Sequence, residues 1–322
     1  MKLVVSSPPH WHGKLTVGKI HHNIILALLP AVIFSLFTYG MHALRVIALA
    51  VAVAVIADIL IRKAFKKPVT ATDGSAFLIG LLFALLLPPS APYWFVITGA
   101  LLCIFIKEIF GGLGSTPLSP VLAGWAILHI SWPGYLNFNL GAANFDLSFP
   151  LHYPLTMLKN GGTEMISDFT IMDLLLGQQV GGIGAAAILC ILIGGIYLLV
   201  RKIITWEIPV SFAAGILIMG TIFRLVNGAK YGDPLFHLLT GSVMIGMFFL
   251  ATDFSSSPYN KWGKIVFGLS IGILTIIFRA WSVHPDGVIY AILIMNLFTP
   301  LLDKIKNKPV PLAINHIERR TP

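Results

Sequence analysis

Apolar residues form long runs along this chain, and short polar or charged segments separate them. About ten runs can be distinguished, and several of them are short for a full crossing. A helix needs about 20 predominantly apolar residues to cross a bilayer. The pattern therefore predicts an all-α, polytopic membrane protein with about ten transmembrane helices. The runs cover residues 23–40, 44–61, 75–88, 93–110, 119–133, 181–200, 207–224, 234–252, 264–280 and 286–302.

Two of the short runs carry marks of interruption. The run "AFLIGLLFALLLPP" stops at a double proline, and the run from residue 119 follows the glycine-rich "GGLGSTPLSP". Irregular backbone at membrane depth is tolerated where it is buried in protein or lines a cavity. We therefore expect broken or half-inserted helices that line a site at these two places.

Composition supports a membrane protein rather than a soluble one. Of 322 residues, 57% are apolar and 11% are charged, and the mean hydropathy is +0.87, whereas a soluble domain carries about 25% charged residues. No separate soluble domain is visible. The first residues contain no apolar run long enough for a signal peptide, so we expect the N-terminus to be retained. The net charge of +9 suits contact with anionic lipid headgroups and requires no nucleic acid.

The lysines and arginines predict an orientation. If the N-terminus is cytoplasmic and all ten runs cross, most of the 22 basic residues fall in cytoplasmic segments, as the positive-inside rule requires. Both termini are then cytoplasmic, and residues 134–180 form a loop on the outer face. The exceptions on the outer side are Arg45, Lys159, Arg224, Lys230 and Arg279.

A weak internal symmetry divides the chain into two halves. "DGSAFLIGLLFALLLPPSAP", from Asp73, and "GDPLFHLLTGSVMIGMFFLATDFSSSP", from Gly232, each begin with an acidic turn, run apolar and end in a Ser/Pro cluster. Each would be the third crossing of a five-helix half, and such halves would have opposite orientations, as in inverted-repeat transporters. The predicted organisation is a cytoplasmic segment (1–22), a first half (23–133), the outer loop (134–180), a second half (181–302) and a cytoplasmic tail (303–322).

Charged side chains near the membrane are candidates for function because each is costly unless it is partnered or hydrated. Asp58, Lys107, Glu108 and Arg279 lie near the ends of runs, where a long side chain reaches the interface. For Asp58 we favour the interface over an ion path. Asp253, in "FFLATDFSSSP", has no base beside it, and both interpretations stay open for it.

Histidines and cysteines predict no metal site. His10, His12, His21 and His22 cluster near the N-terminus, but no cysteine or carboxylate nearby completes a coordination shell, so we favour an exposed cluster. His129 and His237 each stand alone in a run and would suit haem only if a second histidine faced them. We interpret Cys103 and Cys190, both within apolar runs, as structural.

Catalytic signatures such as a Walker loop, a nucleophile elbow or a dinucleotide fingerprint do not occur in this sequence. "GGLGSTP", with Gly111, Gly112 and Gly114, follows no strand, so it does not predict a nucleotide cradle. It is either a tight re-entrant turn or a place where backbone closely approaches a flat cofactor or an ion.

Several long motifs, in the right order from about residue 6 to 305, resemble one family. The chain is similar to the D-type membrane subunit of the Rnf-type ion-translocating ferredoxin:NAD oxidoreductase, which is itself similar to the B-type subunit of the sodium-translocating NADH:quinone reductase. The motifs are "SSPPHWHGKLTVGKI" followed by "LALLPA", "KEIFGGLGSTPLSPVLAGWAIL", "LLTGSVMIGMFFLATDFSSSP" with "GKIVFGLSIGILTIIFR", and "HPDGVIYAILIMNLFTPLLD".

This resemblance implies a ten-helix subunit of a multi-subunit complex in the cell membrane of a bacterium or archaeon. Such complexes transfer electrons between ferredoxin and NAD and couple that transfer to the export of sodium ions or protons. In the family this subunit carries flavin, commonly FMN linked through its phosphate to a threonine of the outer loop. A further, non-covalently held flavin in the bundle is also implied, with riboflavin as the candidate. The interrupted segments around Gly111–Pro117 and Asp73 are our expectation for its surroundings.

The outer loop departs from the family pattern at the attachment point. "YPLTMLKNGG" matches the downstream half of the family's site and includes Lys159, but Tyr153 occupies the position of the modified threonine and His152 that of an alanine. Three alternatives remain. The flavin is bound non-covalently with Tyr153 stacked on its ring, it is attached at Thr156, or the subunit lacks the outer flavin.

The resemblance also suggests how the chain would work. The flavin would supply the redox chemistry and the protein its position and electrostatic environment, without a complete active site in this subunit. Coupling to ion movement would need two states with different ion access, and Asp253 and Asp286 are the acids we would test. A divergent quinone-linked redox subunit and an inverted-repeat transporter or channel without flavin remain alternatives.

Overall fold

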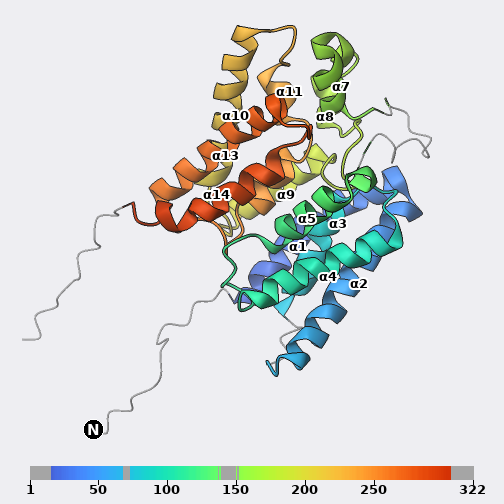
Figure 1. Ribbon diagram of the computed structural model, residues 1–322, viewed down its shortest axis with the longest axis vertical. Helices are drawn as coiled ribbons and strands as arrows, with labels where there is room; N and C mark the ends of the chain where they lie inside the picture. Colours follow the sequence, from blue (N-terminus) through green and yellow to red (C-terminus); the bar gives the residue numbers. More distant parts are fainter. Residues whose placement is uncertain (1–15, 68–72, 137, 139–149, 151, 306–322) are drawn as a thin grey trace, which may run out of the picture.

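The computed structural model describes residues 16–67, 73–136, 138, 150 and 152–305 of this chain (Figure 1). Within these residues every regular element is helical and no strand occurs, which confirms the all-α prediction. The elements are α1 (Val17–Tyr39), α2 (Met41–Ala64), α3 (Ser75–Leu86), α4 (Tyr93–Ile109), α5 (Pro120–Ser131), η2 (Pro133–Leu136), α7 (Pro154–Gly161), η3 (Gly162–Ile166), α8 (Ile171–Leu175), α9 (Ile188–Val200), α10 (Glu207–Val226), α11 (Pro234–Leu238), α12 (Val243–Ile245), η4 (Gly246–Leu250), α13 (Lys261–Trp281) and α14 (Val288–Leu302).

Each apolar run of the sequence contains at least one helical segment in the described residues. Four helices there, α1, α2, α10 and α13, are long and apolar enough to cross a membrane. Helices α3, α5, α9 and α14 are apolar but have only 12 to 15 residues. Because a full crossing needs about 20 residues, the short helices rely on protein around their ends.

The run at residues 234–252 is not one helix. It consists of α11, an irregular turn, the short α12 and a π-helical turn, η4. The break lies at Gly241, whose φ is +69°, and Ser242 follows it as the N-cap of α12. The start of α3 has the same local form, since Gly74 with φ +73° precedes Ser75. Glycine adopts this left-handed conformation without the steric cost that a Cβ imposes.

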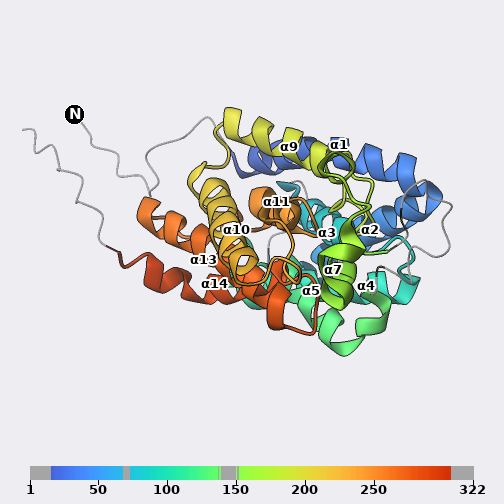
Figure 2. The same cartoon turned by 90° about the horizontal axis from the view of Figure 1, so that it is seen from above.

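Helices of the first and second halves pack in matching ways. Helix α2 packs against α3 and α4, and α10 packs against α11 and α13. Helix α4 contacts α5, and α13 contacts α14. Between the halves, α1 lies beside α9, as the blue and yellow helices of Figure 2 show, and α5 contacts α14. The core is continuous across both halves, because one cluster of buried apolar side chains includes residues from each.

The C-terminal end of α3 is covered by the segment that leads into α9. The amide of Ile183 donates to the carbonyl of Leu87 at 2.8 Å, and the amides of Gly184 and Ala185 donate to the carbonyl of Leu85 at 2.9 and 3.2 Å. These carbonyls belong to the end of a helix, where intrahelical partners are missing. Backbone of the second half therefore satisfies the end of a short helix of the first half.

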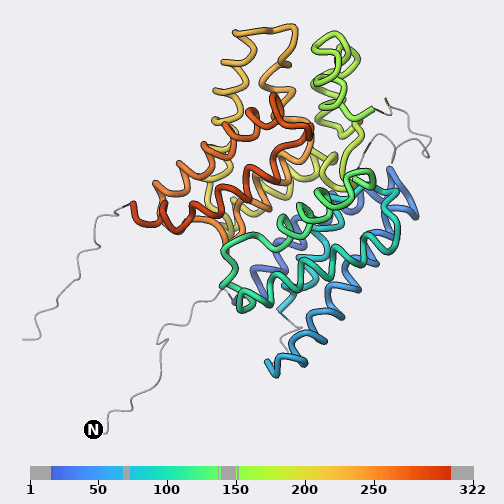
Figure 3. The backbone as a smooth tube through the Cα atoms, in the orientation of Figure 1, coloured from blue at the N-terminus to red at the C-terminus, as the bar shows by residue number. Residues whose placement is uncertain are grey.

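The predicted outer loop, residues 134–180, contains η2, α7, η3 and α8, and residues 137, 139–149 and 151 lie outside the described part. Figure 3 shows the green turn of α7 beside the gold end of α10. The contact includes a hydrogen bond from the amide of Thr163 to the carbonyl of Ala229 at 2.9 Å. This loop is folded onto the helices and forms one wall of a cavity.

Candidate functional site

A cavity of about 370 Å³ lies at the end of the bundle that carries α7. Its walls come from α5, α7, the segment before α9, the turn before α12, and α14 with the loop preceding it. We name it the Tyr153 cavity. The side chains that matter for its chemistry are Trp125, His129, Tyr153, Thr156, His284 and Asp286.

Tyr153 is the N-cap residue of α7 and is almost completely buried, with 3% of its surface exposed. Its ring packs against that of Phe138 at a centroid distance of 5.1 Å. Burial, the charge of Asp286 and a hydrogen bond with that carboxylate raise the pKa of the Tyr153 phenol, and Arg279 opposes the rise. The phenol therefore stays protonated and is held by Asp286, and the tyrosine forms a fixed part of the wall.

Thr156 and Lys159 lie on α7 but face different surroundings. Thr156 is in the first turn, partly buried, and lines the Tyr153 cavity. Lys159 is exposed and borders a smaller pocket that Lys230 and Arg279 also line. Partial burial lowers the pKa of its amino group. Of the two, only Thr156 lines the Tyr153 cavity.

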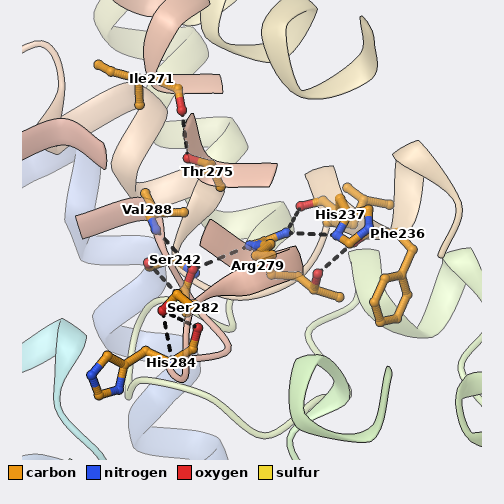
Figure 4. A network of polar contacts seen from close by, with 12 residues as sticks. Phe236, His237, Ser242, Ile271, Thr275, Arg279, Ser282, His284 and Val288 are labelled. Atoms are coloured by element: carbon orange, nitrogen blue, oxygen red, sulfur yellow. Dashed lines mark hydrogen bonds and ion pairs between the residues drawn. The ribbon is translucent and has the colours of Figure 1, made fainter. Parts of the chain in front are cut away.

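Asp286 is fixed by a buried polar network (Figure 4). Its Oδ2 accepts hydrogen bonds from the amide and the hydroxyl of Ser242 at 2.8 and 2.6 Å. Its Oδ1 lies 3.4 Å from Nη2 of Arg279. The guanidinium also donates to the carbonyls of His237 at 2.6 Å and Thr240 at 2.8 Å. Arg279 is 6% exposed, so the expected position at the interface is wrong for it.

A second cavity of about 370 Å³ lies at the opposite end of the bundle. It is bounded by the starts of α1, α3 and α5, the ends of α4 and α9, and the segment from η4 to Ser255. We name it the Lys107 cavity. Among the predicted site residues it contains Gly112, Gly114 and Asp253.

Asp73, Gly111 and Gly112 line a surface pocket beside the Lys107 cavity. Gly111, Gly112 and Gly114 have φ values of +105°, +94° and +85°, which accounts for glycine at each position. The structure thus brings together all four residues that we associated with the flavin in the bundle.

A network of buried ion pairs borders the Lys107 cavity. Nζ of Lys107 lies 2.9 Å from Oδ1 of Asp58 and 2.9 Å from the hydroxyl of Ser75. Nε of Arg62 lies 3.2 Å from Oδ2 of Asp58 and 3.3 Å from Oε1 of Glu108. Asp58 and Lys107 are each 1% exposed and Glu108 is 3% exposed. The expectation that these three side chains reach the interface is therefore wrong: they are buried and paired.

Asp253 lies in the Lys107 cavity, and its Oδ2 accepts hydrogen bonds from Ser255 at 2.8 Å and Ser256 at 3.2 Å. The hydroxyl of Thr116 donates to that of Ser255 at 2.8 Å. Asp253 and Asp286 thus line different cavities, at opposite ends of the molecule.

Sequence reasoning missed two features of the Tyr153 cavity. Trp125 is buried, and its Nε1 has no hydrogen-bond partner within the described residues. A second histidine does face His129, since the rings of His129 and His284 lie 4.2 Å apart. These two histidines are far apart in the chain, so spacing carried no signal. His10 and His12 lie outside the described residues, and no group of three or more metal-ligating side chains occurs among those described.

Comparison with known proteins gives matches over nearly the whole chain. The model of the NQR2, RnfD, RnfE family matches residues 4–310. The D subunit of the Na(+)-translocating ferredoxin:NAD(+) oxidoreductase complex of Acetobacterium woodii is 37% identical over 313 residues, 96% of this chain and 95% of that protein. Its counterpart in the proton-translocating ferredoxin:NAD(+) oxidoreductase complex of Clostridium ljungdahlii is 38% identical over 309 residues, 93% of each chain.

A third relative is more distant. The D subunit of the ion-translocating oxidoreductase complex of Ectopseudomonas mendocina is 33% identical over 323 residues, 94% of each chain. Together with the apolar helices, these relatives identify a multi-pass membrane protein. This chain belongs to the NQR2, RnfD, RnfE family.

Proposed function

We propose that this chain is a D-type membrane subunit of an ion-translocating ferredoxin:NAD oxidoreductase complex, in which it relays electrons through flavin. The observation that carries the proposal is the match over more than nine-tenths of the chain to the D subunits of such complexes. The partners are then the other subunits of the complex and the bilayer of the cell membrane. This subunit contributes to the reaction of the complex without a complete active site of its own.

The Tyr153 cavity is the proposed site of one flavin, FMN. Its volume of about 370 Å³ falls within the range of about 300–1,000 Å³ that is common for small-molecule sites. Apolar walls suit a flat ring system, and Trp125 belongs to these walls. The hydroxyl of Thr156 supplies a polar group. A bound flavin would supply the redox chemistry.

In this cavity we propose non-covalent binding. Tyr153 stands where the family's modified threonine stands, and its phenol is buried and bonded to Asp286. The ring of Tyr153 is part of the wall against which the flavin packs. Attachment at Thr156 would instead leave flavin on the peptide after denaturation.

The Lys107 cavity is the proposed site of a second flavin, of the riboflavin type. It has the same volume as the first, and the glycines at 111, 112 and 114 let the backbone approach a flat ligand closely. Lys107, Ser75 and Thr116 are polar groups in its wall.

We further propose that the two halves are inverted five-helix repeats. The matching packing of α2, α3 and α4 with α10, α11 and α13 supports this arrangement. A Gly-Ser turn that occurs in both halves also supports this arrangement. In the first turn Lys107 donates a hydrogen bond to the hydroxyl of Ser75, and in the second the hydroxyl of Ser242 donates one to Asp286. Arg62, Lys67 and Lys107 gather at the end opposite α7, which supports cytoplasmic termini and an outer position for α7.

Asp253 and Asp286 are the proposed acids for ion coupling. Each lines one of the two cavities, so each would be positioned to respond to the charge on a ligand there. Coupling requires that the two ends open to ions alternately.

Flavin analysis of the purified full chain tests the proposal. We expect yellow protein that releases flavin on denaturation, with no mass added to the peptide that contains residues 152–166. An FMN adduct mapped to Thr156 within that peptide would show covalent attachment there. If the complex is isolated intact and this chain, once separated from it, contains no flavin, the electron-relay function would be overturned. A structural or ion-conducting role would then be favoured.

A further inference from the structure

Three titratable side chains from separate segments meet in the wall of the Tyr153 cavity. Nδ1 of His129, on α5, forms a 2.7 Å hydrogen bond with the hydroxyl of Tyr290, on α14. The ring of His284, from the loop between α13 and α14, lies 4.2 Å from that of His129 and stacks on Tyr290 at 5.7 Å. His129 and His284 both line the cavity.

This cluster is not explained as an ion pair. The nearest carboxylate, Asp286, is already bonded to Ser242 and Arg279. Two imidazoles in ring contact disfavour double protonation, because like charges repel. Partial burial lowers the pKa of the His284 imidazole, and the positive charge of Lys159 lowers it further. The two imidazoles therefore carry at most one positive charge between them.

Trp125 packs directly against His129. The ring of Trp125 lies 4.6 Å from that of His129, and its buried Nε1 has no partner among the described residues. Trp125 and His129 both line the cavity, so a ligand bound there would lie beside His129.

We propose that His129 exchanges a proton with the ligand that is reduced in the Tyr153 cavity. This rests on the proposed function, in which that ligand is a flavin and the electron comes from the preceding carrier of the complex. On reduction of the bound group, a protonated His129 would donate a proton from Nε2 to it and become neutral. Tyr290 holds Nδ1 and fixes the orientation of the imidazole. The proton on His129 is replaced from water through the partly exposed His284, and oxidation reverses the transfer.

The charged and titratable groups around this pair come from every neighbouring element. They are Asp286 and His284 from the α13–α14 loop, Arg279 from α13, Lys159 and Tyr153 from α7 and its N-cap, and Tyr290 from α14.

The test is the rate of electrochemical reduction of the flavin in the purified full chain, followed by its absorbance between about pH 5 and 8, the range in which histidine changes charge. In the unaltered chain we expect the rate to fall as pH rises. In His129→Gln we expect the rate to fall at least tenfold and to lose its dependence on pH, and in Tyr290→Phe we expect that dependence to move to another pH. His22→Gln, an exposed histidine at the other end, is the matched control and keeps the dependence.

An unchanged dependence in His129→Gln with flavin bound overturns the proposal. If that variant does not fold, His284→Gln decides, because blocked access to water must slow proton-coupled reduction at least tenfold, and an unchanged rate overturns the proposal. Unaltered chain without flavin would instead refute the proposed function on which the inference rests.

Discussion

Ser242 donates both its amide and its hydroxyl to one carboxylate oxygen of Asp286, at 2.8 and 2.6 Å. The two residues are 44 positions apart and join the start of α12 to the loop before α14. The other oxygen of Asp286 faces Arg279. A single carboxylate thus connects the interrupted helical segment from α11 to η4 with α13 and α14, directly at the wall of the Tyr153 cavity.

Replacing Asp286 should destabilise the chain strongly. In Asp286→Asn the guanidinium of Arg279, whose side chain is 3% exposed, loses its carboxylate. A buried charge without its partner costs about 3–5 kcal/mol, and thermal unfolding in detergent measures the loss. Asp233→Asn is the matched control, because the Arg224–Asp233 pair is about half exposed and should contribute less than about 1 kcal/mol. Equal losses in both variants would contradict the central role of Asp286.

Gly241→Ala should disturb the same network. The added Cβ would lie 2.9 Å from Oδ2 of Asp286 and 3.0 Å from Nη2 of Arg279, at a φ of +69°. Gly114→Ala has the same backbone problem, with φ +85°, but no atom within 4 Å of its Cβ. The left-handed conformation costs about 1–2 kcal/mol in both. The difference in unfolding temperature therefore measures the contacts, and we expect Gly241→Ala to be clearly the less stable.

Lys107→Met should weaken the opposite end of the bundle. The substitution removes the 2.9 Å contact with Asp58, although Arg62 remains beside that carboxylate. We expect a loss near the lower end of the range for buried pairs, about 3 kcal/mol, together with loss of flavin from the Lys107 cavity. Lys63→Met, at an exposed position of α2, should stay within about 0.5 kcal/mol. A stable variant with unchanged flavin content would show that the network is dispensable.

Tyr153→Phe should lower stability in a way that depends on pH. The phenol is a donor to Asp286, and its loss should cost about 1–3 kcal/mol. Because the pKa of Tyr153 is raised in the folded chain, its contribution is complete below about pH 10, where the unfolded phenol is also protonated, and decreases as pH rises further. The difference in unfolding temperature between the variant and the unaltered chain should therefore shrink above about pH 10. Tyr259→Phe, at a residue that is 89% exposed, should show no such change.

The sequence predicted the helices well because their signals are local. Apolar runs and flanking prolines such as Pro88 and Pro120 mark where the helices start and stop. The glycines at 111, 112 and 114 could be associated with a cavity because each needs a positive φ in an irregular segment.

Pairings between distant side chains could not be predicted in this way. Asp58 and Lys107 looked like interfacial residues because each is near a helix end, and only the packing of α2 against α4 brings them together. The contact of Tyr153 with Asp286 likewise depends on α7 folding back over the bundle. The break at Gly241 was not predicted, because Thr240, Gly241 and Ser242 lie between two apolar stretches that together have the length of one run.

The cover over the end of α3 restricts the order in which the chain can assemble during synthesis. The carbonyls of Leu85 and Leu87 receive their partners from residues 183–185, which leave the ribosome much later. Lipid offers no substitute donor. We therefore expect α3 to stay beside the insertion machinery, or to be incompletely packed, until residues 183–185 have been synthesised. We expect a chain truncated at residue 175 to be degraded quickly and a chain truncated at residue 226 to survive longer, which pulse–chase labelling would measure. Equal lifetimes would mean that α3 is stable without the donors from residues 183–185.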